Sequence, residues 1–161
     1  PDVVVYNAGI ARDNMFVFMS PEEWDSVIHT NLDGFYHTVQ PLLFGMIARR
    51  SGRIIVITSA SGQSGQAGQV NYAASKAALA AAVKSLAREV GRKGILVNAV
   101  SPGVIETDMT AELPKEQILP MIPLKRFGTP EEVAGVISFL CSPDSTYLHG
   151  QVIAVNGGLL T

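Results

Sequence analysis

Three side chains that could transfer a proton stand between residues 59 and 76. Tyr72 and Lys76 are four residues apart in an alanine-rich segment, and this spacing puts two side chains on one face of a helix. A free tyrosine has a pKa near ~10 and exchanges protons poorly at neutral pH. An ammonium group beside it favours the phenolate, so the pair predicts a lowered tyrosine pKa. Ser59 could hold a carbonyl oxygen beside the phenol, and the three predict a proton-transfer site for a carbonyl or alcohol.

A solvated surface pair is the ordinary alternative, because Y-x-x-x-K occurs often by chance on helices. The position of Ser59 favours the functional interpretation. It directly follows a β-branched apolar run that predicts a buried parallel strand over residues 54–58.

Alternating strand and helix patterns predict the elements that position these residues. Apolar runs predict strands over 3–6, 54–58, 95–100 and 151–155. Capping boxes at Ser20 and Thr129 predict two helix starts, and further helices are expected from Asn31 to about Arg49 and from about Tyr72 to Val90. The pattern is typical of an α/β protein with a Rossmann-like, doubly wound parallel sheet of about four strands flanked by helices.

Composition limits the other classes of function. The 161 residues suit one domain, and the net charge of −2 favours neither nucleic acid nor a membrane surface. The histidines and the single cysteine lack metal-ligand spacing, so no metal site is expected. One cysteine permits no internal disulfide, and without a signal pattern or a membrane-length apolar run we expect a cytoplasmic protein.

The combined motifs resemble the short-chain dehydrogenase/reductase family. The Ser and Y-x-x-x-K spacing is accompanied by N-A-G at 7–9, N-L-D-G at 31–34 and P-G-V-I-E-T at 102–107. The resemblance implies four catalytic residues: Asn31, Ser59, Tyr72 and Lys76. In the family the asparagine bends its helix and holds a water that connects the lysine to solvent.

The resemblance also implies a nicotinamide cofactor, with backbone contacts at Ile105 and a hydroxyl contact at Thr107. The cofactor-binding residues it implies are Asn7, Ala8, Gly9, Tyr72, Lys76, Pro102, Gly103, Ile105 and Thr107. Residues 108–126 mix apolar side chains with three prolines, which predicts either a poorly ordered loop or a substrate lid with an apolar underside. In relatives this segment is the lid.

Longer strings such as N-A-G-I-A-R-D-N and S-P-G-V-I-E-T-D-M-T look close to the bacterial 3-oxoacyl-acyl-carrier-protein reductase branch of the family. That branch implies NADPH, with NAD possible, and a substrate bound to an acidic carrier protein. Arg50 and Lys93 match its docking positions, and we expect them beside the lid. Arg49, Arg53 and Arg92 could enlarge this basic patch. The family also implies a homo-oligomer, a dimer of dimers, that packs through the helices from Asn31 and Tyr72.

The family's glycine-rich pyrophosphate turn, G-x-x-x-G-x-G, does not occur in the sequence; Gly62, Gly65 and Gly68 have a different spacing. We therefore expect residues 1–161 to be the C-terminal two thirds of the family domain, without the residue that selects NAD or NADP. Two alternatives stay open. One is another alcohol, sugar or steroid dehydrogenase, and the other is a truncated, non-catalytic oligomerisation partner.

Overall fold

The computed structural model describes residues 1–161 and contains one parallel sheet. Its four strands are β1 (Val3–Tyr6), β2 (Gly52–Ile57), β3 (Ile95–Pro102) and β4 (Val152–Val155), hydrogen-bonded in that order. Every neighbouring pair is parallel. The predicted α/β, Rossmann-like class is confirmed. β2 begins two residues earlier than predicted, because Gly52 pairs with Ile95 at the start of β3.

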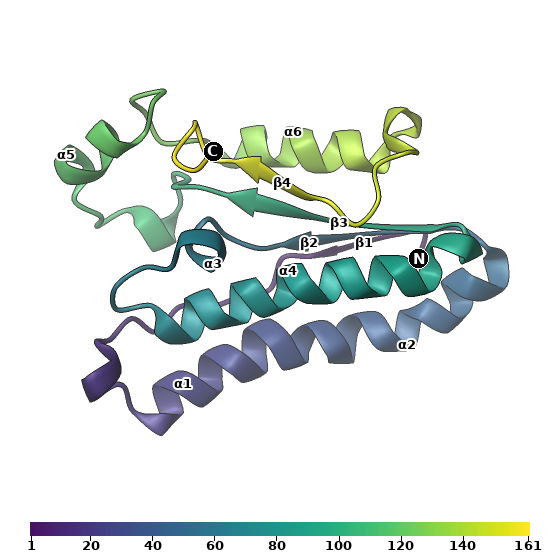
Figure 1. Cartoon of the computed structure of the whole chain (residues 1–161), viewed down its shortest axis with the longest axis horizontal. Coiled ribbons are helices and arrows are strands. Elements are labelled where there is room, and N and C mark those ends of the chain that lie inside the picture. The colour runs from purple at the N-terminus through teal and green to yellow at the C-terminus, as the bar shows by residue number, and fades with distance from the viewer.

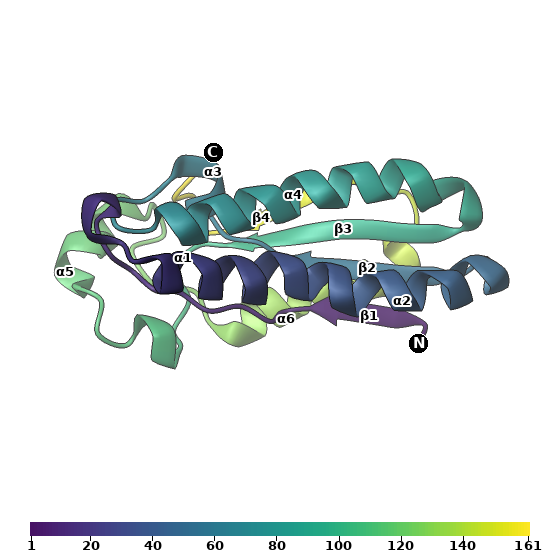
Figure 2. The ribbon, with the colours of Figure 1, turned by 90° about the horizontal axis from the view of Figure 1, so that it is seen from below.

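The long helices cover both faces of the sheet (Figures 1 and 2). One face carries α1 (Pro21–Ile28), a π-helical turn (His29–Asp33), α2 (Gly34–Arg49) and α4 (Val70–Val90). The other face carries α6 (Pro130–Cys141). The remaining helical segments are short: η1 (Phe16–Phe18), α3 (Ser61–Ser64), η3 (Gly91–Lys93), η4 (Asp108–Thr110), α5 (Lys115–Ile118), η5 (Leu119–Met121) and η6 (Pro143–Ser145).

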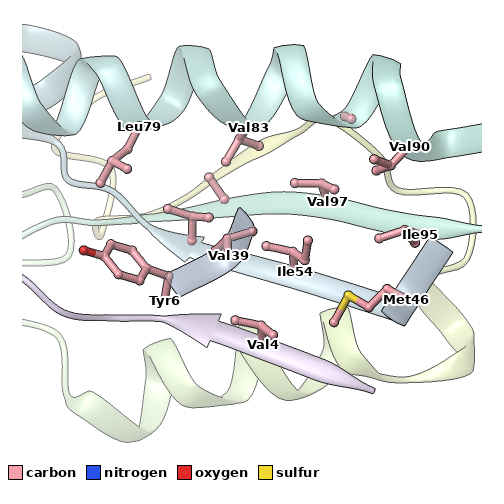
Figure 3. Close-up of a cluster of buried hydrophobic side chains, with 13 residues drawn as sticks. Val4, Tyr6, Val39, Met46, Ile54, Leu79, Val83, Val90, Ile95 and Val97 are labelled. Atoms are coloured by element: carbon pink, nitrogen blue, oxygen red, sulfur yellow. The ribbon is translucent and has the colours of Figure 1, made fainter. Parts of the chain in front are cut away.

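Alternate side chains of the central strands enter two hydrophobic cores. On β2, Ile54 and Val56 face the core under α2 and α4, whereas Ile55 and Ile57 face α6. This is the two-residue period of a strand buried on both faces. Figure 3 shows the larger core, where strand residues such as Ile54 and Val97 face Leu79, Val83 and Val90 of α4.

Both predicted capping boxes are confirmed. The Ser20 hydroxyl accepts the Glu23 N–H at 3.2 Å, and the Glu23 carboxylate accepts the Ser20 N–H at 2.8 Å. Thr129 and Glu132 make the same reciprocal pair at the start of α6. These bonds satisfy amide donors that have no partner inside the helix.

The segment from 108 to 126 forms three short helical turns, η4, α5 and η5, beyond the carboxyl ends of the strands (Figure 1). Ile122 is buried, but Met109, Met121 and Leu124 are exposed. Most apolar side chains of this segment are therefore exposed on its surface and do not enter either core. Its role as a lid stays a prediction.

β1 has one uncovered face and one unpaired edge. Val4 and Tyr6 are buried against the helices, whereas Val3 and Val5, on the opposite face, are exposed. Only β2 pairs with this strand. An unpaired edge beside exposed valines favours pairing with another chain.

We predict that residues 1–161, purified alone, self-associate, and that Val3→Lys with Val5→Lys reduces this association. Lysine on an edge strand opposes strand pairing, and neither valine is needed in the core. Light scattering and circular dichroism check both effects. A wild-type chain that stays monomeric and well folded would contradict the prediction.

Candidate active site

Ser59 lies at the carboxyl end of the sheet. The hydrogen bonding between β2 and β3 continues past the strands, through Thr58 N–H to Val100 O at 2.8 Å and Ala60 N–H to Pro102 O at 2.9 Å. These bonds fix the residues on either side of Ser59. The Ser59 Oγ accepts the Ser61 N–H at 3.1 Å, and its hydroxyl lies within hydrogen-bonding reach of the Tyr72 phenol.

Tyr72 and Lys76 lie on α4, which packs closely behind Ser59. Lys76 is only 4 % exposed; its Nζ lies 5.6 Å from the centre of the Tyr72 ring and donates to Ile57 O at 2.9 Å. The short helix α3 approaches α4 at Gly62, where a Cβ would lie 2.9 Å from the Ala77 nitrogen. The structure thus gathers the predicted serine, tyrosine and lysine around the end of β2.

The predicted lowering of the tyrosine pKa is wrong, because the pKa of Tyr72 is raised. Burial raises the pKa of Tyr72, the Ser59 hydroxyl opposes the rise, and the Asp13 carboxylate adds to it. Burial also lowers the pKa of Lys76 to about 8. The physical reason is that the phenol is removed from water, and this desolvation disfavours the charged phenolate more than the Ser59 hydroxyl favours it.

Asn31 lies in the π-helical turn, which is the local helix distortion that the family resemblance implied. Its side chain is 0 % exposed. Oδ1 accepts the Ile10 N–H at 2.8 Å, and Nδ2 donates to Ile10 O at 3.1 Å and Ser75 Oγ at 3.0 Å. This amide therefore holds the loop after β1 against α4. A proton relay through Asn31 stays a prediction.

Tyr6 and Gly34 stabilise this turn, and the sequence analysis missed both. The Tyr6 hydroxyl donates to Thr30 O at 2.7 Å and lies 3.2 Å from Asn31 O, so it satisfies carbonyls that a π-turn frees from the helix. A Cβ at Gly34 would lie 2.6 Å from that hydroxyl. The sequence did contain a signal for Gly34, because a glycine inside a helical pattern weakens the helix and so points to a packing requirement.

The N-A-G segment borders the same site. A Cβ at Gly9 would lie 3.2 Å from Lys76 Nζ and 3.4 Å from Asn31 Oδ1. Gly9 therefore lets the loop lie directly against these two side chains. Asn7 and Ala8 are exposed at the carboxyl end of β1, where a ligand could reach them.

The P-G-V-I-E-T segment has two separate roles in the structure. Gly103 faces β4: its N–H donates to Val155 O at 2.9 Å, and a Cβ would lie 2.8 Å from Asn156 Cα. Its lack of a side chain is therefore required by the protein itself. The Ile105 N–H donates no hydrogen bond within the chain, and Pro102 and Thr107 lie on either side of this stretch.

A cavity of about 270 Å³ lies next to Ile105 on the side of β4. Leu124, Asn156 and the Arg126–Glu132 ion pair contribute to its walls. The Arg126 guanidinium holds the pKa of the Glu132 carboxyl at about 2. Because the Arg126 guanidinium and the Glu132 carboxylate pair with each other, this wall offers no unpaired cation to a ligand.

Arg50 and Lys93 lie at the opposite end of the sheet from Tyr72, so their expected place beside the lid is wrong. They precede the β2–β3 pairing that begins at Gly52 and Ile95, and the 21 residues of α4 separate the two ends by ~30 Å at 1.5 Å per residue.

The arginines of the expected basic patch differ in how far their guanidinium groups are exposed to solvent. Arg53 donates to Leu140 O at 2.9 Å and Ser145 Oγ at 3.1 Å, so it holds the end of α6 and is not part of a free surface. Arg49 donates to Pro1 O, and Arg50 donates to the Arg92 carbonyl. Both of these guanidinium groups remain at the surface.

No group of three or more His, Cys, Asp or Glu side chains is arranged to hold a metal ion. None of the helices combines the length and apolar character needed to span a bilayer.

The buried Lys76 predicts a pH-dependent stability. Its folded pKa of about 8 lies below the ordinary value of 10.5, so between these values the unfolded chain holds a proton that the folded chain releases. Stability should therefore rise with pH from about 8 to 10. Urea unfolding of the complete protein should show this rise, and Lys76→Met should abolish most of it.

Lys84→Met is the matched control, because Lys84 lies on the same helix but is exposed. It should keep the rise. An equal pH dependence in Lys76→Met and wild type would contradict the assignment to Lys76.

Residues 1–160 match the model of a family described as enoyl-(acyl carrier protein) reductase. The chain is 52 % identical over 158 residues to a 3-oxoacyl-acyl-carrier-protein reductase of Aggregatibacter actinomycetemcomitans, which covers 97 % of the chain and 65 % of the relative. It is 51 % identical over 162 residues to the Pseudomonas aeruginosa protein of the same name, covering 99 % and 66 %.

An acetoacetyl-CoA reductase of Rhizobium meliloti is 49 % identical over 161 residues, covering 98 % of the chain and 67 % of the relative. The chain thus spans about two thirds, 65 %, of the length of the first of these relatives. The match extends over nearly every residue described above, including the Ser59, Tyr72 and Lys76 region. The chain belongs to the short-chain dehydrogenase/reductase family.

Proposed function

We propose that the complete protein is an NADPH-dependent 3-oxoacyl-acyl-carrier-protein reductase. One observation supports this most: Ser59, Tyr72 and Lys76 gather at the end of β2 in a chain about 50 % identical to relatives with that name. We further propose that residues 1–161 form the C-terminal part of a single domain, because the matched residues cover only 65 % of such a relative's length. In this view the unpaired edge of β1 is completed by the rest of the domain.

In the proposed reaction the Ser59 hydroxyl donates a hydrogen bond to the carbonyl oxygen of the 3-oxoacyl thioester. Tyr72 gives its proton to that oxygen as the carbonyl becomes an alcohol. A raised tyrosine pKa keeps the phenol protonated before the reaction, which suits a proton donor. Lys76, held by Ile57 O, places a cation beside the tyrosinate that forms. The hydrogen bonds of Asn31 to Ile10 and Ser75 hold the loop after β1 and α4 in place around these groups.

The residues of the carboxyl edge fit a nicotinamide cofactor. The free Ile105 N–H is a suitable donor to a carboxamide oxygen, and the Thr107 hydroxyl is exposed nearby. Gly9 lets the loop after β1 lie close to Lys76. The Lys76 ammonium is the group that would bind a ribose hydroxyl of the cofactor. When bound, this cofactor supplies the hydride for the carbonyl carbon. NADPH is proposed from the relatives' branch of the family, with NAD as the alternative.

A second candidate is an acetoacetyl-CoA reductase, because two relatives at 46 % and 49 % identity have that name. Both activities reduce a 3-oxoacyl thioester to its 3-hydroxy form and differ in the carrier. Comparing kcat/KM for a carrier-protein thioester and for acetoacetyl-CoA in the complete protein separates them. A higher value for acetoacetyl-CoA would favour the second candidate.

We also propose a cytoplasmic homo-oligomer, a dimer of dimers, that packs through the outer faces of α2 and α4. Tyr36 and Phe44 project from α2 into solvent, with Phe44 82 % exposed, so both side chains are free to pack against another subunit. If Arg50 and Lys93 dock a carrier protein, the docked carrier lies far from Tyr72 of the same subunit. The docking site would then serve the active site of an antiparallel neighbour.

Replacing Tyr72 with Phe should reduce turnover of a 3-oxoacyl thioester by at least ~100-fold, because it removes the general acid. The affinity for NADPH should change little. Steady-state kinetics and cofactor titration on the complete protein measure both.

Tyr147→Phe is the matched control, since this tyrosine is fully exposed; it should keep normal turnover. Near-normal turnover in Tyr72→Phe would refute the assignment of the proton donor.

Reversing charge at Arg50 and Lys93 to Glu should weaken the use of a carrier-protein-bound substrate and spare a small soluble thioester. The loss should shrink as salt rises, because exposed charges are screened. KM for the two substrates at two ionic strengths measures the effect. Equal losses on both substrates would mean that these residues act through folding or oligomerisation instead.

A further inference from the structure

Asn71 is a fully buried polar residue, 0 % exposed, directly before Tyr72. Its side chain lies among backbone groups from three parts of the chain. A buried amide is costly unless it is hydrogen-bonded, and every hydrogen bond of this side chain is to backbone. These backbone groups therefore fix the position of the Asn71 side chain, and the side chain in turn restricts how far they can move.

The first bond connects Asn71 to Tyr72 itself. Asn71 Oδ1 accepts the Tyr72 N–H at 2.8 Å. Tyr72 is the third residue of α4, which begins at Val70, so its N–H has no partner within the helix. The asparagine supplies that partner and fixes the helix start two residues before the predicted boundary.

The other bonds connect Asn71 to the wall of the site. Nδ2 donates to Arg12 O at 3.0 Å and to Glu23 O at 3.1 Å. Arg12 belongs to the loop after β1, and Glu23 belongs to α1. One amide thus ties the start of α4 to both segments.

The carbonyl of Tyr72 is held from the other side. It accepts the Ser75 hydroxyl at 2.8 Å, and Ser75 Oγ in turn accepts Asn31 Nδ2 at 3.0 Å. Both backbone polar atoms of Tyr72 therefore contact buried side chains that reach distant segments. This arrangement limits how the phenol can shift relative to Ser59 and Lys76.

We propose that Asn71 is a positioning residue for Tyr72, acting through the Tyr72 amide and through the two carbonyls at Arg12 and Glu23. It touches neither substrate nor cofactor. Its effect on catalysis depends on the function proposed above, whereas its effect on the tyrosine does not. A displacement of the proton donor by about 1 Å is enough to cost ~100-fold in rate.

Asn71→Asp and Asn71→Ala in the complete protein test the proposal. The aspartate keeps an acceptor for the Tyr72 N–H but loses both donated bonds, and alanine loses all three. Asn98 is the matched control: it is buried, donates to Leu148 O at 2.8 Å and accepts the Gln151 N–H at 3.0 Å. Asn98→Asp and Asn98→Ala therefore remove similar bonds elsewhere.

Two measurements are made at equal folded fraction. We expect kcat on a 3-oxoacyl thioester to fall at least ~10-fold in both Asn71 variants, with KM for NADPH nearly unchanged. Both Asn98 variants should keep the wild-type kcat. The ring ¹³C resonance of Tyr72, assigned with Tyr72→Phe, should shift or broaden only in the Asn71 variants.

Equal effects of the Asn71 and Asn98 variants on kcat and on the Tyr72 resonance would overturn the proposal, because Asn71 would then be an ordinary structural residue. A wild-type protein that reduces no 3-oxoacyl thioester would overturn the proposed function instead. In that case the Tyr72 resonance still decides whether Asn71 positions the tyrosine.

Discussion

The buried ammonium of Lys76 is the constraint on which the arrangement of the site depends. A charge removed from water requires a close partner, and Lys76 finds it in the Ile57 carbonyl at the end of β2. Two other segments also approach this part of α4 closely: the short helix α3 at Gly62 and the loop after β1 at Gly9. The position of Lys76 fixes that of Tyr72 one turn earlier, and the end of β2 fixes Ser59. The helix–sheet contact therefore determines the geometry of all three groups.

A set of buried polar contacts supports this geometry from the opposite side. The π-helical turn brings Asn31 inward, the Tyr6 hydroxyl satisfies the carbonyls of the turn, and Gly34 leaves space for that hydroxyl. Asn31 then connects the loop after β1 to Ser75 on α4. Every side-chain nitrogen and oxygen that is fully buried has a hydrogen-bond partner. A polar network of this kind is rigid when it is complete and costly when one member is lost, which suits a site that must hold a proton donor in place.

The two ends of the molecule have different chemistry. The carboxyl end of the sheet holds Ser59 and Tyr72, together with exposed apolar residues of η1 such as Phe16 and Phe18. The amino end holds the cationic side chains of Arg50 and Lys93. Since α4 spans the distance between them, a partner bound by the cations cannot lie at the catalytic groups of the same chain.

The sequence by itself determined the parts that depend on short-range patterns. Apolar runs predicted the four strands, capping boxes predicted two helix starts, and the Ser, Tyr and Lys spacing predicted a shared site. Only the tertiary structure decided the rest. The raised pKa of Tyr72 depends on the burial of its phenol. The need for glycine at position 103 arises from its close contact with Asn156, directly after the last strand. Asn71, Tyr6 and Gly34 obtained their roles from partners 20 to 60 positions away or from a π-turn that no local pattern encodes. Arg50 and Lys93 were placed wrongly because the family resemblance was followed without its strand geometry. Both residues precede predicted parallel strands, which puts them at the amino end of the sheet, opposite Ser59. Local propensity acts over a few residues, whereas burial, desolvation and hydrogen-bond partners are set by segments that meet only in the folded chain.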